Sequence, residues 1–131
     1  MESQTDPDFE VLAVDDGSTD ATPELLAAWA AQDPRVRVIR QAPSGIVAAL
    51  ERARSEARGT YLARMDADDR CEPQRFALQR ALLESTPELA GCGARVRYFP
   101  RHQLRDGARR YEAWLNSATT AEEVAREVFV E

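Results

Sequence analysis

The chain has 131 residues, a length that suits one domain with one sizeable core. Hydrophobic residues make up 44% of it, which excludes a disordered tail, and the formal net charge of -6 disfavours nucleic acid as a partner. Its 2 cysteines, Cys71 and Cys92, are too few for a disulfide scaffold, so we expect free thiols in a reduced compartment, the cytoplasm.

The first predicted element is a short buried strand over residues 9–14, because an apolar run there is bounded by turn residues at 15–18. A helix should follow, with Thr22 as its N-cap and Asp33 at its end, before a proline. Residues 36–40 alternate between apolar and charged side chains, which predicts a second strand.

A second helix is predicted after a loop at residues 42–45, with Gly59 as its C-terminal cap. The apolar residues expected on its buried side are Ile46, Val47, Leu50, Ala53 and Ala57. Residues 61–65 predict a third strand and residues 94–99 a fourth.

A third helix is expected between those last two strands, opening at Glu72 and Pro73 and ending near Pro87. Residues 106–130 contain two weaker helical stretches. The second of these has an apolar stripe formed by Ala121, Val124, Ala125, Val128 and Phe129.

Strands and helices alternate from residue 9 to residue 99, a pattern typical of an α/β fold with a mostly parallel sheet flanked by helices. Two acidic clusters, residues 15–16 and residues 66–69, directly follow predicted strands. Because ligands bind at the carboxyl ends of parallel strands, we expect both clusters on one rim of the sheet.

Asp66 and Asp68 are two carboxylates separated by one residue. Mg²⁺ and Mn²⁺ prefer oxygen ligands, and Mg²⁺ commonly takes one or two carboxylates together with substrate phosphates. One interpretation is therefore a metal site that neutralises a diphosphate. The other is an Asp-rich turn that caps a helix.

Asp15 and Asp16 also admit two interpretations. In one, they satisfy backbone donors of a strand-to-helix turn. In the other, a carboxylate accepts hydrogen bonds from a base N–H or a ribose hydroxyl. Two acidic clusters on one rim would repel each other unless a cation or donor groups are present, which favours the functional interpretation.

The segment VDDGSTDAT at residues 14–22, followed by ARMDADD at residues 63–69, resembles the family 2 glycosyltransferases of the GT-A fold. Residues 44–49 and 57–62, and then Pro73, Arg75 and Phe76, add to the resemblance. It covers roughly residues 5–99 and implies a partial GT-A, Rossmann-like α/β fold.

The resemblance implies an enzyme that transfers a sugar from a nucleotide diphosphate, most simply a UDP-type donor, with Mn²⁺ or Mg²⁺ as cofactor. Asp15 or Asp16 would contact the nucleoside. Asp66 would lie near the ribose and the metal, and Asp68 would be the chief metal ligand. Asp69 would support them or cap a helix, and Arg64 would face the phosphates or solvent.

The chain also departs from the family pattern. Residues 1–8 match only the tail of the family's first helix, so we expect a single partial domain, with a core at 9–99 and a helical extension at 100–131. The catalytic base is unknown and expected beyond the chain end, and Glu51 stands where the family often has an amide. By this resemblance the family's first strand, which usually lies in the centre of the sheet, is missing here. Its absence would leave open sheet edges that a second copy could pair with, which suggests a homodimer. It also suggests that the fragment is inactive.

Two rival functions remain open, a non-catalytic nucleotide-sugar-binding or assembly module and a nucleotidyltransferase. The second lacks support because no Gly-rich phosphate loop is present. Basic residues at 101–110 form either a solvated face or a patch for a phosphate or an anionic membrane surface. His102 is assigned to a loop, and the sugar and the acceptor are not identified by the sequence.

Overall fold

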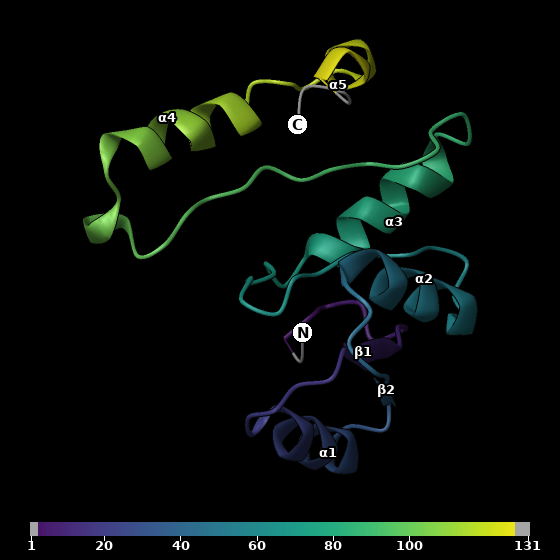
Figure 1. Cartoon of the computed structure of the whole chain (residues 1–131). Coiled ribbons are helices and arrows are strands. Elements are labelled where there is room, and N and C mark those ends of the chain that lie inside the picture. Colours follow the sequence, from purple (N-terminus) through teal and green to yellow (C-terminus); the bar gives the residue numbers. More distant parts are fainter. Residues whose placement is uncertain (1–2, 128–131) are drawn as a thin grey trace. The chain divides into compact units, whose positions relative to one another are not determined.

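The structure, a computed structural model, describes residues 3–127 (Figure 1). The chain divides into two compact units, Met1–Glu88 and Leu89–Glu131. In the described part of the chain, no helix is long and apolar enough to cross a membrane. Cys71 and Cys92 are half-buried and are not joined to each other by a disulfide bond, as expected.

The first unit is built around two parallel strands, β1 (Val11–Asp15) and β2 (Val36–Arg40), joined by helix α1 (Thr22–Gln32). The register pairs Val11 with Val36 and Asp15 with Arg40. Parallel neighbours need a crossover connection, which α1 provides. Both strands and the α/β fold with a parallel sheet are thereby confirmed.

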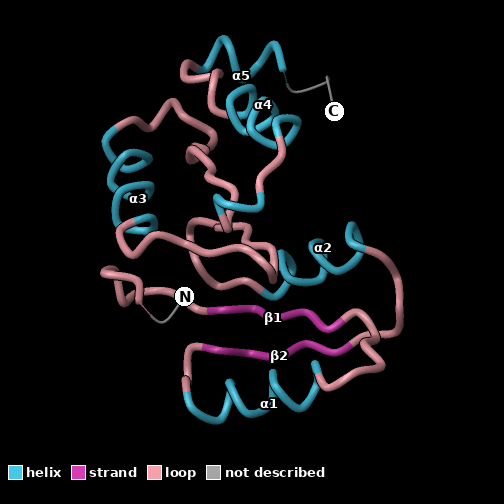
Figure 2. The backbone as a smooth tube through the Cα atoms, turned by 90° about the vertical axis from the view of Figure 1, so that its left-hand side faces the viewer, coloured by secondary structure: helices cyan, strands magenta, loops and turns pink. Residues whose placement is uncertain are grey.

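Helices cover this strand pair from two sides. Helix α1 packs against both strands, and helix α2 (Ile46–Glu56) packs against β1. Figures 1 and 2 show α1 and α2 on opposite sides of the pair. The apolar core that they enclose consists of Val11, Val36 and Ile39.

One predicted boundary of each of the first two helices is wrong by a residue or more. Thr22 is the first residue of α1 and not its N-cap; Asp20 Oδ1 accepts a hydrogen bond from the Thr22 N–H at 3.0 Å, so the turn is held from outside the helix. Helix α2 ends before Gly59, because Ala57 already has an extended backbone and its N–H bonds to Arg54.

The predicted apolar side of α2 is also wrong in part. Ile46 and Val47 are 63% and 78% exposed, whereas Ala53 and Ala57 are half-buried as expected, and so is Ala49, which was not among the predicted residues. Small side chains let a helix axis approach a strand closely, and they lie on the side of α2 that packs on β1. The larger apolar side chains are left in solvent.

The third and fourth strands predicted at residues 61–65 and 94–99 do not form. A strand needs a hydrogen-bonded neighbour, and in the described residues the only ladder is the one between β1 and β2. In the second unit the side chain of Asn116 takes the place of a neighbouring strand. Its Nδ2 donates to the Val96 carbonyl and its Oδ1 accepts from the Val96 N–H, each at 2.8 Å.

Residues 3–8 are irregular and not the tail of a helix. This segment packs against helix α3 (Arg75–Ser85). The third predicted helix therefore forms, but it begins at Arg75 and not at Glu72 and Pro73. Gln4 and Asp6 are buried; Gln4 Oε1 accepts from the Phe76 N–H at 3.1 Å, and Asp6 pairs with Arg80 at 2.9 Å.

The second unit contains a short 3₁₀ turn, η1 (Arg101–Gln103), and helices α4 (Asp106–Leu115) and α5 (Ala121–Glu127). These two helices confirm the helical stretches expected after residue 106. Val128 and Phe129 of the predicted apolar stripe lie outside the described residues.

Candidate functional site

The turn after β1 is organised by Asp15, whose side chain is almost fully buried. Its Oδ1 accepts a hydrogen bond from the Ser18 N–H at 2.8 Å, and its Oδ2 lies 3.4 Å from Arg40 Nε without a hydrogen bond. Hydrogen bonding from Ser18, aided by the charge of Arg40, holds the pKa of Asp15 below its usual value. The carboxylate therefore stays ionised at neutral pH.

Asp16 joins this turn to the loop before α2. Its Oδ1 accepts from Gln41 Nε2 at 2.8 Å and from the Ser44 N–H at 2.9 Å, and its Oδ2 accepts from the Gly45 N–H at 2.8 Å. These donors, Gln41 first, lower the pKa of Asp16. Both loops at the carboxyl ends of β1 and β2 are thus fixed by one carboxylate.

Gly17 permits the close approach of these two loops. Its φ is +80°, and a Cβ built there would lie 2.5 Å from ring carbons of Pro43. Gly45 also has a positive φ, of +86°, but no atom lies within 4 Å of the Cβ it lacks. Only glycine meets both demands at position 17.

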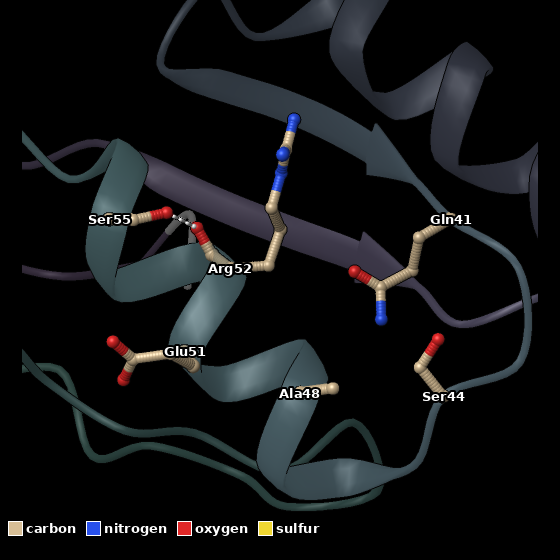
Figure 3. Close-up of a pocket in the computed structure, with 6 residues that line it drawn as sticks. All are labelled: Gln41, Ser44, Ala48, Glu51, Arg52 and Ser55. Atoms are coloured by element: carbon tan, nitrogen blue, oxygen red, sulfur yellow. Dashed lines mark hydrogen bonds between the residues drawn. The ribbon is translucent and has the colours of Figure 1, made fainter.

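A shallow groove opens beside the loop that Asp16 holds (Figure 3). Its volume is about 400 Å³, and it follows one side of α2. Six residues line it: Gln41, Ser44, Ala48, Glu51, Arg52 and Ser55. Gln41 and Ser44 are also partners of Asp16, so the carboxylate fixes the end of the groove. Glu51, where the resemblance led us to expect an amide, accepts a hydrogen bond on Oε2 from Arg54 Nε at 2.9 Å.

The second acidic turn is more exposed. Arg64 Nε donates to Asp66 Oδ1 at 3.1 Å, and the Asp69 N–H donates to the Asp66 carbonyl at 3.2 Å. Asp68 is exposed, and its carboxylate has no hydrogen bond or ion pair within residues 3–127. Arg64 is occupied by Asp66, so its positive charge offsets that carboxylate.

The structure does not join the two acidic turns through a hydrogen bond or an ion pair between described residues. Nor do three or more Asp, Glu, His or Cys side chains of this part of the chain cluster around a point that could hold a metal. The convergence of Asp15 and Asp16 with Asp66 and Asp68 therefore stays a prediction. The donor chemistry fits a cation that takes few protein ligands, because Asp68 is uncommitted.

Several residues that shape the first turn were not identified from the sequence. Gln41, Pro43 and Gly45 lie more than twenty residues after Asp16, and only the fold brings them to its carboxylate or to Gly17. The signal in the sequence that could have indicated this close approach is the pair Gly17 and Gly45, which lie in the turns after the two strands.

Comparison with known proteins gives a consistent result. The sequence model of the family described as "Glycosyl transferase family 2" matches residues 1–127. The chain is 35% identical over 91 residues to the "Uncharacterized glycosyltransferase EpsJ" of Bacillus subtilis (strain 168), covering 69% of this chain and 26% of that protein.

Two further relatives extend the comparison. The "Uncharacterized glycosyltransferase YibD" of Escherichia coli (strain K12) is 36% identical over 93 residues, which is 70% of this chain and 27% of the relative. A "Chondroitin synthase" of Escherichia coli is 43% identical over 76 residues, or 58% of this chain and 11% of the relative. The chain thus spans about a quarter or less of the length of these relatives.

Proposed function

Since this chain belongs to glycosyl transferase family 2, we propose that it forms the part of a glycosyltransferase that binds a nucleotide-diphosphate sugar. The relatives that carry glycosyltransferase and chondroitin synthase names support glycosyl transfer in polysaccharide synthesis as the wider setting. Donor binding is the activity we assign to these 131 residues. Transfer of the sugar to an acceptor is proposed for the glycosyltransferase of which these residues form a part.

The observation that carries this proposal is the state of Asp16. An ionised carboxylate offers about four acceptor positions, and three of them are filled by Gln41, Ser44 and Gly45. One position on Oδ2 is left. A carboxylate fixed by three donors and kept ionised is suited to accept the N–H of a base or a ribose hydroxyl without having to reorganise. Asp15 supports Asp16 because its hydrogen bond from the Ser18 N–H holds the turn in which both residues lie.

Asp68 and Asp66 are the residues we propose for a divalent cation, Mn²⁺ or Mg²⁺. Asp68 has no other partner in the described chain, and Asp66 has only Arg64. When bound, the cation supplies charge neutralisation for a diphosphate. The guanidinium of Arg64 would remain beside Asp66, or move to a phosphate oxygen when Asp66 turns to the metal.

The partners beyond the donor are also proposals. A UDP-type donor is the first candidate, and the acceptor is left open. The outer backbone groups of β1 and β2 have no partner among the described residues, so a second copy could pair there and form a homodimer. We place the protein in the cytoplasm, with peripheral contact to a membrane through its basic residues as a further proposal.

Thermal unfolding with nucleotides tests donor binding. We expect Mn²⁺ together with UDP to raise the melting temperature, because a ligand that binds only the folded state stabilises it by mass action. Asp68→Asn should abolish the part of the shift that requires Mn²⁺. GDP and dTDP, measured in parallel, decide which base is preferred.

Asp8→Asn is the matched control. Its carboxylate is 93% exposed and lies 3.9 Å from Arg80, so the variant removes one exposed negative charge that does not belong to the acidic turn at residues 66–69. It should keep the full shift. Equal shifts in both variants, or no shift with any of the three nucleotides, would contradict the proposal.

A further inference from the structure

Helix α4 and the segment before it carry a ladder of three aromatic rings. Tyr98 stacks on Tyr111 with ring centroids 6.4 Å apart and 17° between planes, and Tyr111 stacks on Trp114 at 5.4 Å and 27°. The three residues are 36%, 43% and 37% exposed. A stack of this kind normally lies in a core, whereas here each of the three residues remains partly open to solvent.

The polar contacts that hold α4 in its unit are made by side chains other than the rings. Those contacts run through Glu112, which accepts from the Tyr98 N–H at 2.6 Å and pairs with Arg101, and through Asn116, which binds the Val96 backbone. The helix is thus held by these polar contacts as well as by the Tyr98–Tyr111 stack.

Four residues of α4 share the side on which Trp114 lies. Gly107, Arg110, Tyr111 and Trp114 are spaced by three or four residues, which places them on one helical face. No atom lies within 4 Å of the Cβ that Gly107 lacks, so this face is open next to the rings. Arg110 is exposed and has no carboxylate partner in the described chain.

The surroundings of the ladder are basic in an acidic chain. Between residues 95 and 114 there are six arginines and only two acidic residues, Asp106 and Glu112, whereas the whole chain has a net charge of -6. The arginines are Arg95, Arg97, Arg101, Arg105, Arg109 and Arg110. This surface therefore complements a ligand that presents both a flat apolar face and a negative charge.

From this combination we propose that the α4 face of Gly107, Arg110, Tyr111 and Trp114, completed by Tyr98, binds an acidic glycan. The C–H face of a pyranose ring lies on the exposed indole, and the carboxylate of a uronic acid pairs with the guanidinium of Arg110. The choice of a glycan rests on the proposed function, and the site is the one at which the enzyme holds an acidic acceptor chain.

A single-stranded nucleic acid also offers flat rings and negative charge. It carries one phosphate per nucleotide, and its affinity depends on neutralising many of them at once, which a chain of net charge -6 opposes. A glycan carries fewer acid groups and larger apolar faces. It therefore suits the ladder and Arg110, the one arginine on the α4 face that carries the rings, better than a nucleic acid does.

Calorimetric titration of the whole chain at low ionic strength, without donor nucleotide or metal, tests the proposal. The probe is a galacturonate hexasaccharide, and the same hexasaccharide as its methyl ester is the neutral comparison. We expect the acidic form to bind and the ester to bind about tenfold more weakly. Trp114→Ala should weaken binding of the acid about tenfold, and Arg110→Ala should remove the difference between acid and ester.

Two matched variants serve as controls, and far-ultraviolet circular dichroism checks that every variant is folded. Tyr61→Ala removes a 45% exposed tyrosine of the first unit, and Arg126→Ala removes a 69% exposed arginine of α5, outside the basic segment around the ladder. Both should bind like the parent. Trp114→Phe keeps a ring and should recover most of the affinity that Trp114→Ala loses.

Four results would overturn the proposal: no binding of the acid, equal binding of its ester, unchanged binding in Trp114→Ala, or equal binding of a polyglutamate peptide, which has charge without sugar rings. Tighter binding of oligothymidylate would assign the ladder to nucleic acid instead. Because neither nucleotide nor metal is present, these results are independent of the donor test with Asp68→Asn.

Discussion

At the residue scale, the ionised carboxylate of Asp16 connects two loops that are distant in sequence. Its pKa in the folded state is below the ordinary 3.8, chiefly because of the Gln41 side chain and the Ser44 and Gly45 N–H groups. A lowered pKa in the folded state means that the carboxylate stabilises the fold above its unfolded pKa. That contribution is lost as the pH falls through the folded value.

Asp16→Asn should therefore be less stable than the parent near neutral pH, and the difference should shrink as the pH drops below about 4. Urea unfolding at several pH values between about 6 and about 3 measures it. A difference in unfolding free energy that stays constant down to the acid end would show that Asp16 does not hold the loops through its charge.

Gly17 and Gly45 form a natural pair for a second test, because both have a positive φ and only Gly17 faces another residue closely. Gly45→Ala should cost about 1 kcal/mol of unfolding free energy from backbone strain alone. Gly17→Ala should cost about 2–4 kcal/mol, since its Cβ also meets Pro43. Equal losses in the two variants, measured by urea unfolding, would mean that the approach of Pro43 is not tight in solution.

At the element scale, the helices and the first two strands could be predicted because their signals are local. The alternation in β2 and the run before Asp15 are read directly from neighbouring residues. The strand predictions at residues 61–65 and 94–99 were wrong because a strand also needs a neighbour. Their composition favours a strand, but it does not show that Asn116 would take the backbone of Val96.

The apolar side of α2 was mispredicted in part. The periodicity of the sequence identifies a stripe that includes Ile46, Val47 and Ala53, but it does not show which of these residues contact β1. Ala53 is half-buried as expected, together with Ala49, whereas Ile46 and Val47 stay exposed. In the candidate site, the acidic residues could be found from their motif. The hydrogen-bond donors to Asp16, which are Gln41, Ser44 and Gly45, could not be found in this way.

Helix α3 offers a prediction at this scale, because its first turn is capped by a residue far away in sequence. Its N-cap, Gln74, makes no side-chain capping bond, and Gln4 instead binds the Phe76 N–H and the Glu72 carbonyl. Gln4→Ala should lower the unfolding free energy by about 1–3 kcal/mol.

Gln32→Ala is the control for Gln4, since Gln32 is exposed at the end of α1. It should change the unfolding free energy by less than about 0.5 kcal/mol. If the two glutamine variants unfold at the same urea concentration, the N-terminal segment does not support α3.

At the scale of the whole molecule, the chain combines a βαβ unit whose loops are fixed by Asp15 and Asp16 with a second unit that carries a basic aromatic face. The first unit is proposed to hold a nucleotide and a cation through its carboxylates. The second is proposed to hold the acceptor. Membership of glycosyl transferase family 2 links the two roles, because transfer requires a donor and an acceptor.

The central claim is that the turn at Asp15 and Asp16 and the turn at Asp66 to Asp69 serve one nucleotide–metal site. The most direct test is the paramagnetic broadening of backbone amide NMR signals by Mn²⁺ in the presence of UDP. We predict that signals of Gly17 and Ser18 broaden together with those of Asp68 and Asp69, and that Asp68→Asn abolishes both effects. Broadening confined to residues 66–69, or unchanged in Asp68→Asn, would contradict the claim.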